Sequence, residues 1–365
     1  MTRRLDFRVV VAGAGAVGSA VAIALAKAGG RVTLADPAPL GANASGVAAG
    51  MLAPAFESLF DEASPPLALL RQARDLWPEL AASVGLALDR AGAMAVGSPA
   101  QVEEWATGLA GLGAPAARLS SRQARGRAPW LTTGLEGVWT SEDWRLEPML
   151  ALAALRAAAV DLGVVWRRAS VTGFLGGEVT LSDGVRLPVD ALVIATGAAP
   201  SLIGVAPELA CLTPIKGHIL RAPALALGGP VARLEEIYIC PSPGGALIGS
   251  TMEVGRADTG VDADTVARLR ALAARAAPVM AESTLVARAG VRAATPDGLP
   301  LVGAGQTRGV WLAVGARRNG WLLAPLIARA LVEGMIEQRP GAWVRAFDPT
   351  RFNTAPASPK RTLTP

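Results

Sequence analysis

Apolar runs separated by glycine turns open the chain and predict a strand–helix–strand unit. Residues 9–11 are all valine, and Gly13 follows after one small residue. Small and apolar residues then continue to Gly29-Gly30, and a second, mostly apolar segment over 31–35 ends at Asp36. A short apolar run bounded by glycine is typical of a strand that is buried on both faces. The segment therefore predicts a strand, a tight turn, a helix and a second strand.

Apolar positions at helical spacing predict further helices. Leu67, Leu70 and Ala73 recur at this spacing, which predicts one helix over 66–84. Proline suits the first turn of a helix, so Glu147-Pro148 predicts another start. The helix that starts there is expected to end at 162. Further helices are expected over 101–112, over 262–277, and from 320 to about 336.

Turn residues and short apolar segments predict strands, most of them in the second half of the chain. Gly176-Gly177 and 182–184 are hairpin signals within the stretch 164–193. The run 191–197 is apolar and closed by glycine, as expected of a buried parallel strand. Further strands are expected over 92–96, 237–240, 247–251, 284–292 and 310–314.

Length and composition favour two domains with a large core. The chain has 365 residues, more than one ordinary domain, and 51% of them are hydrophobic. Arg3, Arg4 and Arg8 precede an uncharged stretch over 9–26, which resembles a secretory signal or a membrane span. Its glycines disfavour both, and cleavage after 24–26 would separate the first two strands. We therefore expect a cytoplasmic protein without an integral membrane segment.

The distribution of charge gives no indication of a nucleic-acid partner. The formal net charge is +5, and the arginines are scattered apart from Arg122, Arg125 and Arg127. Without neighbouring aromatic residues, this cluster predicts a solvated helix face. The sequence leaves open whether the chain forms a homo-oligomer.

Reactive side chains are few, which disfavours several chemistries. Cys211 and Cys240 lie far apart, so we expect free thiols rather than a disulfide. His218 is the only histidine, so no paired spacing for zinc exists and we expect no metal. A histidine-dependent triad would have to use His218 alone. Its place in an apolar strand favours a structural role.

The glycines of the first turn have the spacing of a dinucleotide-binding site. Gly13 permits the tight turn, Gly15 lets the backbone approach a pyrophosphate, and Gly18 lets the helix pack closely on the strand. The exposed amides at the start of the helix would hold the phosphates. Asp36 would accept the ribose hydroxyls. This turn alone does not distinguish a flavin from a nicotinamide dinucleotide.

Motifs spread over nearly the whole chain follow this turn. They are Ser45-Gly46-Val47-Ala48-Ala49-Gly50-Met51-Leu52, Pro214-Ile215-Lys216-Gly217, Tyr238-Ile239-Cys240-Pro241, Gly249-Ser250-Thr251-Met252-Glu253, Gly290-Val291-Arg292, Pro296-Asp297-Gly298-Leu299-Pro300 and 315–325. Together they resemble the amino-acid-oxidising flavoproteins of the D-amino-acid oxidase superfamily, and among these the glycine oxidases of thiamine biosynthesis.

The resemblance implies FAD, bound without a covalent link. It places Ala16 and Val17 at the pyrophosphate, Asp36-Pro37 at the adenosine ribose, and Val171 at the adenine. The loop near the ribityl chain and ring would comprise Ala44, Ser45, Ala49, Gly50 and Met51. The turn beside the flavin ring would comprise Ala316, Arg317, Arg318, Asn319, Gly320, Trp321 and Leu322.

The resemblance also implies how a small amino-acid substrate is bound. Arg292 matches the arginine that binds the substrate carboxylate, and a guanidinium can do so with two parallel hydrogen bonds. Arg318 matches a second substrate contact, although the neighbouring Arg317 could take that role. Tyr238 matches a hydroxyl donor to the same carboxylate. Met252 would line the pocket near the flavin, and Glu236 is a further candidate for contact with the substrate amine, although a solvent-facing strand residue is favoured.

Several positions depart from the family pattern. Asp36 replaces a glutamate, Ser242 an arginine, and Ala293 a proline. The flavin-side turn has Ala316-Arg317 where the family has a histidine and an aromatic residue, and this departure bears on the substrate preference more than on the cofactor. If the bulky indole of Trp321 points into the pocket, it should crowd a side chain on the substrate's α-carbon, which would favour glycine and sarcosine over D-alanine and make D-proline a poor substrate. Because Trp321 begins a helix, it could instead pack against the FAD domain.

The expected fold is α/β, with a Rossmann-like FAD-binding domain interleaved with a mixed-sheet α+β substrate domain. The FAD domain would comprise 1–84, 144–212 and 293–348, and the substrate domain 85–143 and 213–292. Residues 354–365 are polar and contain prolines, which predicts a disordered tail.

The expected function is oxidative deamination of glycine or a similar small amino acid, with oxygen as acceptor. The products would be an imine that hydrolyses to the 2-oxo acid and ammonia, together with hydrogen peroxide. In the family that the chain resembles, the imine supplies the thiazole of thiamine. One alternative is an oxidase or dehydrogenase for D-amino acids, sarcosine or cyclic imino acids, with a quinone or a protein as acceptor. A non-catalytic flavin-binding protein is a remote alternative.

Overall fold

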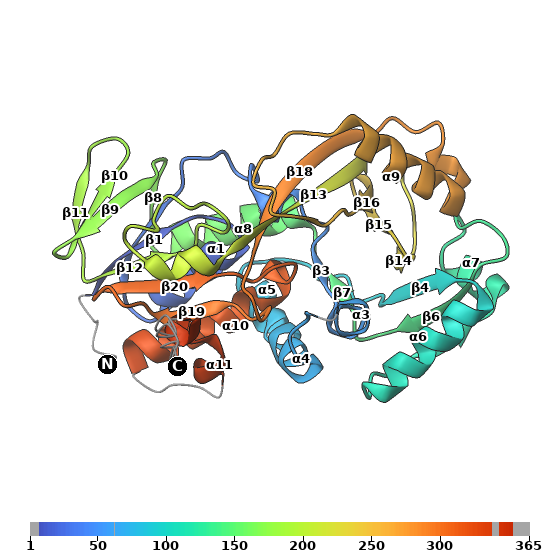
Figure 1. The fold of residues 1–365 in the computed structure, drawn as a ribbon, viewed down its shortest axis with the longest axis horizontal. Coiled ribbons are helices and arrows are strands. Elements are labelled where there is room, and N and C mark those ends of the chain that lie inside the picture. The colour runs from blue at the N-terminus through green and yellow to red at the C-terminus, as the bar shows by residue number, and fades with distance from the viewer. Residues whose placement is uncertain (1–6, 62, 338–342, 353–365) are drawn as a thin grey trace, which may run out of the picture.

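Two large sheets form the framework of the protein (Figure 1). The computed structural model describes residues 7–61, 63–337 and 343–352. The tail predicted over 354–365 lies outside the described residues. In the view of Figure 1, one sheet lies on the left and the other on the right, with short elements between them.

The first sheet has the strand order β19-β20-β12-β1-β2-β8. Its strands are β1 (Arg8–Ala12), β2 (Arg31–Ala35), β8 (Val165–Arg167), β12 (Ala191–Ile194), β19 (Leu301–Ala304) and β20 (Val310–Val314). All neighbours are parallel except β19 and β20. The predicted opening unit is therefore confirmed, because α1 (Ala16–Lys27) connects two neighbouring parallel strands.

The valine run of β1 is buried because the sheet is covered on both faces. Val9 and Val11 belong to one core cluster, which α1, α8 (Pro148–Asp161) and α10 (Gly320–Val332) also line. Val10 belongs to a second cluster on the opposite face. That cluster includes residues of a small antiparallel sheet formed by β9 (Val171–Leu175), β10 (Glu178–Leu181) and β11 (Arg186–Pro188).

The second sheet has the order β17-β13-β16-β15-β14-β4-β6-β5, and β18 pairs with β13. Its strands are β4 (Ala93–Gly97), β5 (Ala117–Leu119), β6 (Glu136–Thr140), β13 (Thr213–Ala222), β14 (Val231–Arg233), β15 (Tyr238–Ser242), β16 (Gly245–Gly249), β17 (Glu253–Val254) and β18 (Val286–Ala294). The pairing of β14 with β4 is parallel, and the other pairings are antiparallel.

Helices cover this second sheet and short elements join it to the first. The covering helices are α6 (Pro99–Gly111), α7 (Ser121–Arg127) and α9 (Ala263–Ala276). The joining elements include α2 (Ala44–Val47), α3 (Pro54–Phe60) and the paired strands β3 (Met51–Leu52) and β7 (Trp144–Arg145). Short helical turns lie at Pro207–Cys211, Pro278–Met280 and Pro349–Phe352, and α11 at Val344–Phe347. The division into two domains at the predicted boundaries stays a prediction.

Three element predictions need correction. The helix predicted over 66–84 is two helices, α4 (Leu67–Asp75) and α5 (Trp77–Ser83), because Pro78 lacks the amide that would continue the first helix. The strand predicted over 247–251 ends at Gly249. The last long helix ends at Val332, and a π-helical turn follows at Glu333–Glu337.

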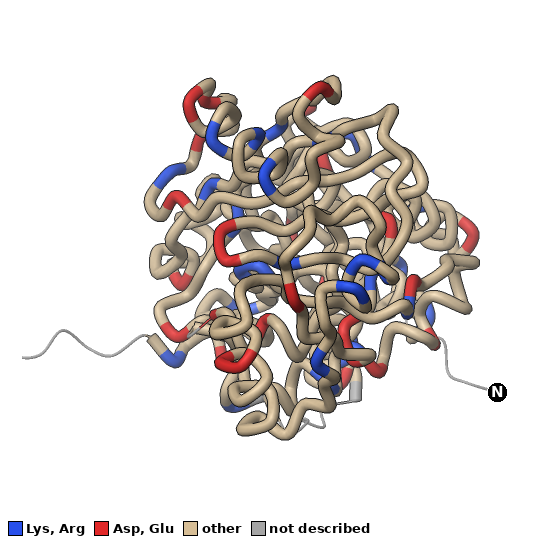
Figure 2. Tube along the Cα trace, turned by 90° about the vertical axis from the view of Figure 1, so that its right-hand side faces the viewer, with Lys and Arg blue, Asp and Glu red and all other residues tan. Residues whose placement is uncertain are grey.

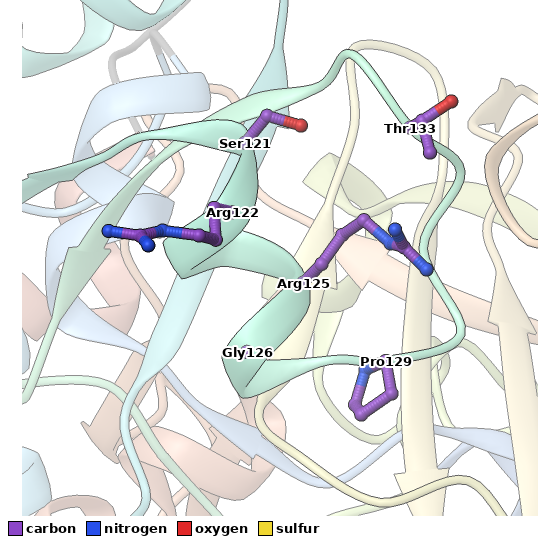
Figure 3. A pocket seen from close by; sticks show the side chains of 6 residues that line it. All are labelled: Ser121, Arg122, Arg125, Gly126, Pro129 and Thr133. Atoms are coloured by element: carbon purple, nitrogen blue, oxygen red, sulfur yellow. The ribbon is translucent and has the colours of Figure 1, made fainter.

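The arginine cluster lies on the surface, as predicted, but an aromatic side chain accompanies it. Arg122, Arg125 and Arg127 belong to α7 and are exposed. The guanidinium of Arg127 lies over the ring of Trp139, 4.4 Å from its centroid, a contact between residues that are distant in sequence. Arg122 and Arg125 point in different directions around a surface hollow, so they do not converge on one ligand (Figure 3).

Charges of both signs are interspersed along the chain in Figure 2. Cys211 and Cys240 are free thiols, as predicted. None of the described helices is long and apolar enough to cross a membrane.

His218 is a buried structural residue of β13, as expected. The amide of Asp262, which caps α9, donates to Nε2 of His218 (3.1 Å). Nδ1 therefore carries the hydrogen and donates to Oε1 of Glu253 (2.8 Å). The imidazole thus connects the start of α9 to β17.

Replacement of His218 tests this connection. His218→Leu leaves the Asp262 amide without its partner, so we expect the free energy of unfolding to fall by about 1–3 kcal/mol. Urea denaturation followed by tryptophan fluorescence measures the change. Glu178→Gln, which removes an exposed ion pair with Arg186, is the control and should change stability by less than about 0.5 kcal/mol. Equal stability of His218→Leu and the parent would contradict the structural role.

Candidate active site

The first glycine turn has the close contacts that its spacing predicts. Gly13 has a φ of 103°, a conformation that favours glycine. A Cβ on Gly18 would overlap the carbonyl of Gly13, so the start of α1 lies directly against the turn. A Cβ on Gly15 would lie 3.0 Å from the hydroxyl of Ser45. The glycines therefore permit close packing of the turn against α1 and the side chain of Ser45.

Asp36 and Ser45 hold this turn in place. The amide of Ala14 donates to Oδ2 of Asp36 (2.7 Å), and the amide of Ala38 donates to Oδ1 (2.9 Å). The amide of Ala16 donates to the Ser45 hydroxyl (3.0 Å) at the start of α1. The carboxylate at the end of β2 thus fixes the turn and still faces the cavity described next.

A cavity of about 490 Å³ runs from this turn toward β18. The predicted site residues that line it are Gly13, Gly15, Ala16, Val17, Asp36, Pro37, Ala44, Ser45, Val171, Arg292, Ala316, Arg317 and Gly320. The other predicted residues do not line it, namely Gly18, Ala49, Gly50, Met51, Tyr238, Arg318, Asn319, Trp321 and Leu322.

Sequence reasoning missed part of the lining. Thr196 and Gly197 follow β12, and the segment continues along the cavity to Ser201. The hydroxyl of Thr196 is buried and has no hydrogen-bond partner among the described residues. The position of Thr196 directly after a buried parallel strand was an available signal, because ligands of such sheets bind at the carboxyl ends of the strands. Ala257 and Thr259, in the loop after β17, had no comparable signal.

One face of the second sheet forms a floor next to the cavity. Pairing across β18, β13, β16, β15 and β14 determines which residues share this face. In strand order they include Arg292, Gly217, Gly249, Tyr238 and Arg233. Cβ atoms on the two glycines would overlap the Arg292 guanidinium and the Tyr238 hydroxyl, respectively. Both side chains therefore lie flat on the sheet.

Arg292 has no carboxylate partner among the described residues. Its guanidinium donates to the Thr251 carbonyl (3.3 Å), the Ser250 hydroxyl (3.1 Å) and the Met252 sulfur (3.6 Å). Burial, together with the nearby Arg318, lowers the pKa of Arg292 from its ordinary value. A half-buried cation that lines a cavity without a counterion is suited to bind an anionic ligand.

Tyr238 lies between two guanidiniums. Burial raises the pKa of its hydroxyl to about 12, although Arg292 and Arg233 lie close enough to oppose the increase. The hydroxyl therefore stays protonated near neutral pH and can donate a hydrogen bond.

Two carboxylates bind the neighbouring arginines Arg317 and Arg318. One lies on α3 and the other at its C-terminal end, and the sequence analysis predicted neither. Glu57 contacts Arg318 through both oxygens, at 3.0 and 3.1 Å, and Asp61 pairs with Arg317. Arg317 has a φ of 48°, which directs consecutive side chains to adjacent acidic partners. Acidic residues four positions apart on a helix were an available signal, but no helix was predicted there.

Trp321 does not crowd the cavity as expected. Its indole is buried, donates to the carbonyl of Ser45 (3.0 Å), and lies 6.1 Å from the ring of Trp77. It therefore supports the loop that lines the cavity. Glu236 pairs with Arg268 at the surface, so the solvent-facing interpretation is the better one and contact with a substrate amine is not supported.

Comparisons with known proteins agree with this fold. The family model described as FAD dependent oxidoreductase matches residues 8–334. Glycine oxidase from Geobacillus kaustophilus is 32% identical over 94% of this chain and 96% of that protein. The crystal structure of glycine oxidase from that organism has a TM-score of 0.83 and 28% identity, and the match covers 95% of this chain and 99% of that one. A putative thiamine biosynthesis oxidoreductase from Rhizobium etli is 32% identical over 91% of this chain and 97% of its own length.

The chain therefore belongs to the FAD-dependent oxidoreductase family of the D-amino-acid oxidases. It is an FAD-dependent oxidoreductase similar to the glycine oxidases.

The cavity suits FAD chemically. The open glycine turn, the helix start at Ala16 and the Asp36 carboxylate provide groups for a pyrophosphate and a ribose. The unpaired hydroxyl of Thr196 is available as a further donor. Among the described residues no group of three or more side chains could hold a metal ion.

We expect FAD to be released on denaturation. None of the described residues that line the cavity is a histidine or a cysteine. Acid precipitation of the yellow protein should leave a soluble flavin with the absorption spectrum of free FAD. The native protein, passed over a desalting column, should retain its colour as the control. Colour that remains in the washed precipitate would show a covalent link and contradict the prediction.

Proposed function

We propose that the protein oxidises glycine or a similar small amino acid to the imine. The observation that carries this proposal is the half-buried Arg292, which faces the cofactor cavity without a carboxylate partner among the described residues. A substrate carboxylate would bind Arg292 and accept a hydrogen bond from Tyr238. The relatives named glycine oxidase support the same substrate class.

Bound FAD supplies the hydride acceptor, and the residues of this chain supply the positioning. When Arg292 binds the carboxylate, the α-C–H bond is held in one direction. The contribution of the protein to the rate is then mainly the orientation of this bond. As the hydride leaves, the nitrogen lone pair forms the C=N bond, so the amine must be neutral. The positive charge of Arg292, which lines the cavity without a carboxylate partner among the described residues, favours loss of the ammonium proton.

The proposal also includes the electron acceptor and the biological role of the reaction. Oxygen would reoxidise the cofactor and yield hydrogen peroxide, and water would convert the imine to the 2-oxo acid and ammonia. A role in thiamine biosynthesis is supported by the relative from Rhizobium etli. The two-domain division of the chain, with the first sheet binding FAD and the second binding substrate, is part of the same proposal.

A substrate panel tests the proposed reaction. Glycine should bleach the visible absorption of the holoenzyme under anaerobic conditions, and air should restore it with formation of peroxide. Sarcosine, D-alanine and D-proline should be measured in parallel, with dye reduction as the readout for other acceptors. Faster reduction by D-proline would favour the imino-acid alternative. A lack of reduction by every amino acid would contradict the proposal.

Substitutions of Arg292 test the carboxylate anchor. Arg292→Ala should lower kcat/KM for glycine by a factor that corresponds to about 1.5–3 kcal/mol, mainly through a higher KM, while the flavin stays bound. Arg292→Lys keeps the charge but cannot form two parallel hydrogen bonds with the carboxylate. Its kcat/KM should therefore lie between those of the parent and Arg292→Ala.

Arg186→Ala, at an exposed hairpin position, is the matched control and should behave as the parent. If Arg292→Ala oxidises glycine as the parent does, the anchor lies elsewhere, with Arg317 as the next candidate in the same cavity.

A further inference from the structure

A single buried carboxylate occupies two of the arginines next to the proposed substrate position. Arg233 donates to Oε1 of Glu57 (2.6 Å), and Arg318 reaches the other oxygen through Nε (3.0 Å). The side chains of Glu57 and Arg233 are each 5% exposed. Arg233 comes from the second sheet, whereas Arg318 follows the last strand of the first. Glu57 therefore connects guanidiniums from both sheets.

These arginines lie within electrostatic range of the groups that would bind the substrate. Arg233 and Arg292 both act on the hydroxyl of Tyr238. Arg318 and Glu57 both act on Arg292. Two guanidiniums therefore lie close to the Tyr238 hydroxyl, and a third, that of Arg318, lies close to Arg292. Glu57 pairs with Arg233 and Arg318. Of these three arginines, Arg292 stays available.

The ion pairs of Glu57 are stable over the range in which an oxidase works. Burial alone would raise the pKa of this carboxyl, but Arg318 and Arg233 lower it to about 2. The carboxylate is thus ionised at neutral pH. Nη2 of Arg318 donates to Oε1 of Glu57 (3.1 Å), and Nε of Arg318 lies 3.0 Å from Oε2.

We propose that Glu57 determines specificity for substrates with a single carboxylate by binding Arg233 and Arg318. Among the described residues, Arg292 is then the cavity-lining arginine without a carboxylate partner. The proposal rests on the proposed function, in which the site binds an amino-acid carboxylate. An amino acid with a second acidic group would have to compete with Glu57 for a guanidinium. Without the Glu57 charge, Arg233 would have no carboxylate partner among the described residues, and Arg318 would keep only its longer contact with Asp61 (3.7 Å).

Glu57→Gln removes this charge with almost no change of shape. The probes are acetate, which has one carboxylate, and malonate, which has two, and both can be titrated into the holoenzyme by their effect on the flavin spectrum. We expect the parent to prefer acetate. In Glu57→Gln the ratio of acetate to malonate affinity should fall by about tenfold or more, because a charge-assisted pair with a free guanidinium becomes available to malonate.

Two further variants keep the test decisive. Glu142→Gln loses a carboxylate that pairs with Arg71 away from the site, and it should keep the parental ratio. If Glu57→Gln fails to fold, the double variant Glu57→Gln/Arg233→Met removes one buried charge of each sign. It leaves Arg318 with only its longer contact to Asp61 (3.7 Å) and should also shift the ratio toward malonate.

The outcomes separate the inference from the proposed function. An unchanged ratio in a folded Glu57→Gln enzyme that still oxidises glycine would overturn the role of Glu57. A shifted ratio in an enzyme that oxidises no amino acid would overturn the proposed reaction but retain Glu57 as the residue that selects anions. Parental protein that prefers malonate would also overturn the inference.

Discussion

The contact of Glu57 with Arg233 and Arg318 is the interaction on which the geometry of the site depends. It lies where the two sheets meet, and each partner comes from a different part of the chain. Because a buried charge without a partner is costly, the three side chains stabilise one another's positions. The relative placement of Arg318 and the floor of the second sheet follows from this contact.

Helix α3 places Glu57 with the help of another buried carboxyl group. Asp143 accepts hydrogen bonds from the amides of Ala55 (2.8 Å) and Phe56 (3.1 Å) at the start of the helix. Burial raises the pKa of Asp143 to about 7, even though Arg233 and these amides oppose the change. Asp143 immediately precedes β7, which pairs with β3, so the strand pair and the helix are held as one unit.

The features that the sequence predicted well are local. The valine run, the turn at Gly13 and the acid at Asp36 were identifiable because each is determined by neighbouring residues and a fixed spacing. The ion pairs of the site were not predictable in this way, since Glu57 and Arg233 are separated by 176 positions. The role of Trp321 was misjudged for the same reason, because the direction of its indole depends on Trp77 and the distant Ser45 loop.

A crystal structure of the holoenzyme with acetate would test the central claim most directly. We predict that acetate binds Arg292 and Tyr238 while Glu57 keeps its contacts with Arg233 and Arg318. Acetate bound to Arg318, with Glu57 displaced and Arg292 without an anion, would contradict the assignment of the anchor and the role of Glu57.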